Sequence, residues 1–141
     1  MRKAVFLTFC LFFATITNMA QDNKFKAHIY NKVYDVEIVM DLAEEHITIP
    51  GQAILGQVFG YLKKTTDSRV WAIMSANISK DGKTAEIEMV NDYGSEDLNA
   101  ELRYNNDGTY TLKQLSGSTI KVANKKKWVK LPKELIFEAK K

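Results

Sequence analysis

The fold class is decided by residues 84–115, which carry the sequence TAEIEMVNDYGSEDLNAELRYNNDGTYTLKQL. Apolar residues alternate with glutamates at 85–89, a period of two that is typical of a β-strand with one buried face. Similar runs follow at 98–105 and from residue 110. Between them, Asn-Asp-Gly at 106–108 predicts a tight turn, because glycine readily adopts positive φ. The stretch therefore predicts consecutive antiparallel strands.

The same alternation is the dominant pattern of the chain after residue 30. In the run 33–41 the acidic residues Asp35, Glu37 and Asp41 share one face, which we expect to be the solvated side of a strand. No comparable stretch has helical spacing, so the sequence predicts an all-β fold. The predicted strands are 25–30, 33–41, 46–49, 54–63, 69–78, 84–91, 98–105, 110–115, 119–123, 128–131 and 135–139. Some of these should merge, leaving eight to ten strands.

Residues 21–141 are long enough for one domain with one hydrophobic core. Two architectures suit many consecutive hairpins, a closed barrel and a two-sheet sandwich. We favour a single-domain antiparallel up-and-down barrel, because closure removes exposed strand edges. The sandwich is the alternative.

The N-terminal residues 1–20 have the composition of a secretory signal peptide. Arg2 and Lys3 precede an apolar run at 4–16, and Ala20 supplies a small residue at the expected cleavage site. The run is shorter than the roughly 20 residues of a membrane-spanning helix, so we expect no transmembrane segment after signal removal. These features predict an exported protein, periplasmic or extracellular.

The predicted signal peptide, the hairpin at 106–108 and the closing run with Trp128, Lys130 and Leu131 together resemble the small exported lipocalin-like β-barrel proteins of bacteria. The resemblance implies a barrel fold and a bacterial source.

Charge is distributed unevenly along the chain. Removing Arg2 and Lys3 from the twenty basic residues leaves eighteen against seventeen acidic ones, yet residues 113–141 hold nine lysines and only Glu134 and Glu138 as acids. This lysine-rich strip could attract an anionic partner, although lysines also keep an edge strand soluble and unpaired, which is the interpretation we favour. Export argues against nucleic acid as the partner.

The sequence shows no motif of a catalytic or metal centre. Its two histidines, His28 and His46, do not stand at a ligand spacing with another histidine or a cysteine, and Cys10 lies in the predicted signal peptide. The polar segment Asp92 to Asp97 has oxygen ligands suited to calcium, but we interpret it as a connecting loop. We therefore expect no catalytic residue, metal site or cofactor.

Aromatic residues are scattered over several predicted strands, and a barrel would bring some of them around one interior. Ser75 and Asn77 are in phase with Trp71, which hints at a polar or liganded interior, although the alternative that we favour is a shift of the strand phase at a bulge or aromatics that simply fill the core. The sequence thus predicts binding of a small, partly apolar molecule without catalysis. The alternative is a periplasmic protein-interaction or inhibitor module that uses the lysine-rich strip or the Asp92 to Asp97 loop. The predicted ligand-binding residues are Trp71, Tyr104, Tyr110 and Gln114.

Overall fold

The computed structural model describes residues 23–92 and 95–140, so the predicted signal peptide lies outside the described residues. Eight strands form the main sheet: β1 (Lys26–Asn31), β2 (Val36–Asp41), β5 (Gly60–Lys64), β6 (Val70–Ile78), β7 (Thr84–Asn91), β8 (Asp97–Tyr104), β9 (Tyr110–Gly117) and β12 (Glu134–Ala139).

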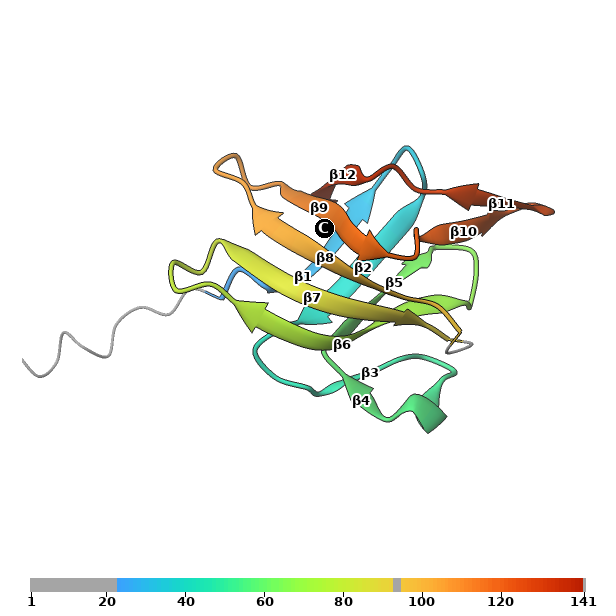
Figure 1. Ribbon diagram of the computed structural model, residues 1–141, viewed down its shortest axis with the longest axis horizontal. Helices are drawn as coiled ribbons and strands as arrows, with labels where there is room; N and C mark the ends of the chain where they lie inside the picture. The colour runs from blue at the N-terminus through green and yellow to red at the C-terminus, as the bar shows by residue number, and fades with distance from the viewer. Residues whose placement is uncertain (1–22, 93–94, 141) are drawn as a thin grey trace, which may run out of the picture.

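These strands close into a barrel in the spatial order β1-β12-β9-β8-β7-β6-β5-β2, and every pairing is antiparallel (Figure 1). Each strand pairs with the next barrel strand along the chain, and the first and last strands close the ring. The predicted up-and-down barrel is confirmed, and the sandwich alternative is wrong.

The register follows the alternation in the sequence. Ile87 lies opposite Ala100, and Met89 lies opposite Leu98, and all four are buried. Glu86 and Glu88 on the other face of β7 are exposed. The barrel interior is therefore an apolar core, and its fully buried side chains include Ile29, Ile38, Leu62, Ile73, Met89, Leu98, Leu102, Leu112 and Phe137.

A bulge in β6 changes which side chains in the second half of the strand face the core. Ile73 pairs with Met89 but Ser75 pairs with Glu88, so Met74 is an extra residue on β6. Past a bulge the alternation resumes one residue later, which turns Ser75 outward. The interpretation that Ser75 and Asn77 face the interior with Trp71 is therefore wrong, since both are exposed, and the alternative of a phase shift at a bulge is confirmed.

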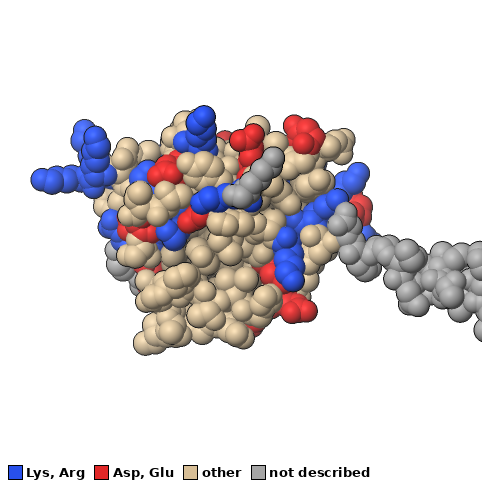
Figure 2. Space-filling view, turned by 180° about the vertical axis from the view of Figure 1, so that it is seen from behind, with Lys and Arg blue, Asp and Glu red and all other residues tan. Residues whose placement is uncertain are grey.

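The predicted strand at 54–63 is divided, because the chain leaves the barrel between β2 and β5. This excursion contains β3 (Ile47–Thr48), the 3-10 helix η1 (Ala53–Leu55) and β4 (Gln57–Val58). Ile49 and Val58 pack on the outer face of β5 and β6 and form a second apolar cluster there. The sequence has no charged residue from 47 to 62, and the lower left part of the molecule in Figure 2 is correspondingly tan.

A second hairpin, β10 (Lys121–Asn124) and β11 (Lys127–Lys130), stands outside the barrel sheet at one end of the barrel. Its turn and the start of β11 carry the exposed lysines 125–127 of the lysine-rich strip, and Lys125 has a positive φ of 61°. The described residues contain no helix that is long and apolar enough to span a membrane.

Candidate functional site

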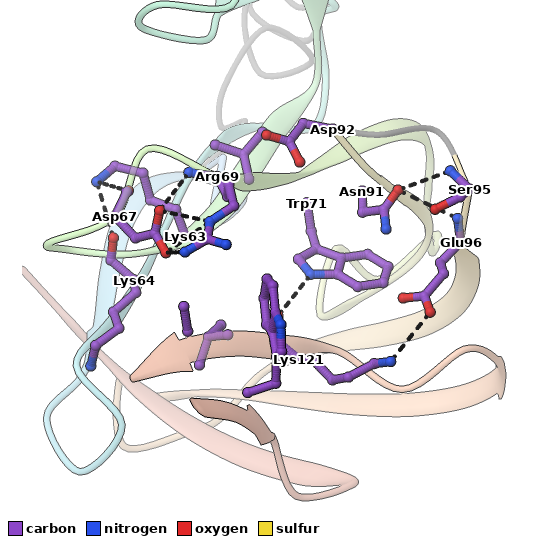
Figure 3. A pocket seen from close by; sticks show the side chains of 14 residues that line it. Lys63, Lys64, Asp67, Arg69, Trp71, Asn91, Asp92, Ser95, Glu96 and Lys121 are labelled. Carbon is purple, nitrogen blue, oxygen red and sulfur yellow. Dashed lines mark hydrogen bonds and ion pairs between the residues drawn. The ribbon is translucent and has the colours of Figure 1, made fainter. Parts of the chain in front are cut away.

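The β10–β11 hairpin, the β5–β6 turn and the β7–β8 connection meet at one mouth of the barrel and enclose a pocket of about 280 Å³ (Figure 3). We call it the mouth pocket. It is lined by Lys63, Lys64, Asp67, Arg69, Val70, Trp71, Asn91, Asp92, Ser95, Glu96, Lys121, Val122, Ala123 and Trp128.

The apolar surface of the mouth pocket is built around Trp71. This side chain lies near the start of β6, where the alternation directs it toward the core, and only 5% of its surface is exposed. Its indole Nε1 donates a hydrogen bond to the backbone carbonyl of Lys121, at 3.3 Å, which ties β6 to β10. Val122 adds a buried aliphatic side chain, and Trp128 on β11 is 54% exposed. A ligand would therefore find one buried and one exposed indole.

Arg69 connects two walls of the mouth pocket. Its guanidinium carbon lies 4.7 Å from the centroid of the Trp128 ring, and its Nη2 lies 2.7 Å from Asp67 Oδ2. The hydrogen bonds from Arg69 hold the pKa of Asp67 below its usual value, against the opposing effect of burial. Asp67 thus stays ionised near neutral pH and fixes Arg69 against the indole face.

Lys121 lies on another wall, where its ammonium is 3.3 Å from Glu96 Oε2. The Asn91 side-chain oxygen accepts hydrogen bonds from the backbone N–H groups of Ser95 and Glu96, at 3.1 and 3.4 Å, which orders the near end of β8 (Figure 3). Lys63 is already engaged, because it donates to the carbonyls of Lys64, Thr65 and Asp67 and lies 3.5 Å from Glu37 Oε2.

These groups give the mouth pocket the chemistry of a binding site. The indoles and Val122 supply apolar surface, and Arg69 and Lys121 supply two cations; the Asp67 partner of Arg69 is largely buried, and the Glu96 partner of Lys121 is partly exposed. A bound anion or hydrogen-bond acceptor could replace Glu96 beside Lys121 at modest cost, since exposed ion pairs contribute only about 0–1 kcal/mol, whereas the Arg69–Asp67 pair, with three side-chain hydrogen bonds, is harder to open.

Of the four predicted ligand-binding residues, the structure brings only Trp71 to the mouth pocket. Tyr104 and Tyr110 lie at the β8–β9 turn, at the other end of the barrel (Figure 1). Their rings meet edge to face with centroids 5.2 Å apart, and the Tyr110 hydroxyl donates to the carbonyl of Lys24 at 2.6 Å. Phe25 packs on Tyr110, so these aromatics hold the N-terminal segment over that barrel end.

Gln114 is buried and fully engaged by the backbone. Its amide nitrogen donates to the carbonyls of Leu131 and Pro132, and its oxygen accepts the N–H of Ile120 at 2.8 Å. The side chain therefore connects β9 to the two ends of the β10–β11 excursion. Gln114 therefore supports the hairpin that covers the mouth pocket and does not line the pocket itself.

The predicted loop Asp92 to Asp97 contributes Asp92, Ser95 and Glu96 to the mouth pocket. Sequence reasoning missed Arg69 and Lys121 as lining residues. Arg69 could have been found, because it stands two residues before Trp71 and shares its strand phase. Lys121 could not, since only the tertiary fold carries the β10–β11 hairpin across the barrel end.

Two pairs of histidine and carboxylate lie on the outside of the barrel. His28 Nε2 is 2.6 Å from Glu37 Oε1, and His46 Nε2 is 2.7 Å from Asp41 Oδ2. Burial acts to raise the pKa of Glu37, but hydrogen bonds from His28 and Lys140 outweigh it and hold the pKa below its usual value. The expectation that Glu37 and Asp41 are solvated is wrong, since these partners cover both carboxylates.

Comparison with protein-family models, with curated proteins and with solved structures gives no match for this chain. The resemblance to lipocalin-like barrels therefore stays a prediction.

Proposed function

We propose that the protein is exported and binds a small, partly apolar molecule in the mouth pocket, without catalysis. The observation that supports this most is the combination of the buried Trp71 indole with the exposed Trp128 indole around one cavity. Small-molecule sites are typically concave and apolar, with a few polar groups that fix the orientation of the ligand.

The size of the cavity, about 280 Å³, favours a small ligand, since typical ligand pockets are about 300–1,000 Å³. Arg69 and Lys121 favour a ligand whose apolar body carries an anionic or hydrogen-bond-accepting group. Burial of the apolar part against the indoles supplies the affinity, and the polar group fixes the orientation. Export is supported by the composition of residues 1–20.

Tryptophan fluorescence tests binding at this place, because the only two tryptophans of the chain both line the mouth pocket. A panel of fatty acids, aromatic carboxylic acids and neutral analogues is titrated into the protein. We expect a saturable change in emission for at least one amphipathic acid. Each single-tryptophan variant, Trp71→Phe and Trp128→Phe, should retain a ligand-dependent signal.

Trp128→Ala should weaken binding of that acid at least several-fold. Ile136→Ala is the matched control, because Ile136 is also an exposed apolar residue on a strand but does not line the pocket. Equal affinity in both variants would refute binding at the mouth pocket. If no acid binds and a protein partner is instead captured through lysines 125–127, the alternative of an interaction module is favoured.

A further inference from the structure

Three potential metal ligands converge where the chain leaves the barrel after β2. Asp41 is the last residue of β2, and Glu44 and His46 follow in the segment that leads to β3. One side-chain ligand atom from each of the three lies within 4.8 Å of the other two. Two carboxylates and an imidazole therefore lie close together outside the mouth pocket.

The backbone fixes the position of Asp41. Its amide N–H donates to the carbonyl of Phe59, and Leu42, buried in the core, donates to the carbonyl of Phe25. The N–H of Ala43 donates to Asp41 Oδ1 at 3.2 Å, which leaves Oδ2 to face His46. The Asp41 side chain is only 5% exposed, so its carboxylate is held in one orientation before any ion binds.

The second histidine–carboxylate pair shows what distinguishes this cluster. Glu37, the partner of His28, also has Lys140 at 3.2 Å and Lys63 at 3.5 Å, and two ammonium groups would repel a metal ion. Beside Asp41 and His46, the third group is instead the carboxylate of Glu44. Lys26 lies opposite Asp41 across the β1–β2 ladder, but Lys26 is exposed to solvent.

We propose that Asp41, Glu44 and His46 bind a divalent transition-metal ion of the Zn²⁺ class. Zinc binds imidazole nitrogen and carboxylate oxygen at about 2.0–2.2 Å, and two tetrahedral ligands at about 2.1 Å lie about 3.4 Å apart. The 2.7 Å separation of His46 Nε2 and Asp41 Oδ2 must therefore open by about 0.7 Å to admit the ion.

Glu44 and His46 are exposed, so both can adjust to the ion and the site is accessible to it. An imidazole ligand selects zinc and its neighbours over calcium and magnesium, which prefer oxygen ligands alone. The ion would join the end of β2 to the start of β3 and so fasten the β3–β4 excursion to the barrel. This proposal is independent of ligand binding in the mouth pocket.

Calorimetric titration of chelator-treated protein with zinc chloride tests the site, in protein without a polyhistidine tag. We expect binding of one ion per chain and a rise in the unfolding temperature at saturating zinc. His46→Ala and Glu44→Gln should each weaken binding at least about tenfold. Both residues are exposed, so these variants should remain folded.

His28→Ala is the matched control, because it removes the other exposed histidine of a carboxylate pair, and it should bind zinc as the unmodified protein does. Equal loss in the His28→Ala and His46→Ala variants would overturn the proposal, as would no binding at millimolar zinc. Competition by calcium at a concentration equal to zinc would overturn the assignment of the metal class.

Discussion

Replacement of Gln114 by leucine tests how the β10–β11 hairpin is held over the barrel mouth. Leucine has a similar size, so the change removes the carboxamide while leaving the volume nearly filled. It leaves the buried N–H of Ile120 without its acceptor and the carbonyls of Leu131 and Pro132 without their donor. An orphaned buried donor costs about 1–3 kcal/mol, and we expect a loss in unfolding free energy of about 2–4 kcal/mol for the three groups together.

Urea denaturation of the Gln114→Leu variant measures this loss, and a midpoint shift at unchanged slope would mark a change in stability alone. Gln114→Glu is the informative companion, because it keeps the acceptor for Ile120 but brings a buried carboxylate oxygen against the carbonyls of Leu131 and Pro132; at neutral pH it should cost at least as much as Gln114→Leu. Gln57→Leu, on the exposed side of β4, is the control and should be nearly neutral. A loss below about 0.5 kcal/mol for Gln114→Leu would refute the supporting role of this side chain.

Three further changes are expected to have measurable effects. Gly60→Ala should destabilise the barrel by at least about 1–3 kcal/mol, because an added Cβ would lie 2.5 Å from the carbonyl oxygen of Val39; a chemical denaturation midpoint like that of the unmodified protein would contradict this close approach. Glu37→Gln should destabilise the protein at pH 7. Because the folded pKa of Glu37 is lowered, the stabilisation by its carboxylate is present above the ordinary pKa of 4.5 and is lost as the pH falls through the lower folded pKa. The stability difference between the variant and the unmodified protein should therefore shrink below pH 4.5, and a difference that grows below that pH would be inconsistent with the ion pairs. Trp128→Ala should change the melting temperature little, because the indole is half exposed. A large drop in the melting temperature would show that Trp128 stabilises the fold rather than serving only as the rim of the pocket.

The barrel was predictable because its information is local. Alternation at 84–91 and 98–104 specifies one buried face, and the Asp-Gly turns specify hairpins between neighbouring strands. A chain of such hairpins has few ways to cover its edges, and closure is the simplest of them. The split of the predicted strand at 54–63 was not visible, since apolar residues there pack on the outside of the barrel instead of within it.

The candidate site was predictable only in part, because it depends on contacts between distant segments. Trp71 was found from its strand phase, but a one-residue bulge at Met74 reversed the phase that linked it to polar neighbours. Tyr110 shared an alternating strand with Leu112 and Gln114, yet its position at the far barrel end follows from the length and direction of β9. The spacing of Asp41, Glu44 and His46 is a local signal for the proposed metal site that a search for pairs of histidine and cysteine does not detect.

Native mass spectrometry of the protein purified from an exporting bacterial host tests binding in the mouth pocket most directly. The spectrum of the folded protein is compared with that of the denatured protein and with that of the Trp128→Ala variant. We expect a small-molecule adduct, retained from the host or gained from added amphipathic acids, that is lost on denaturation and reduced in the variant. An unchanged apo mass with every added acid, or an adduct that is equally strong in Trp128→Ala, would contradict a ligand site at the barrel mouth.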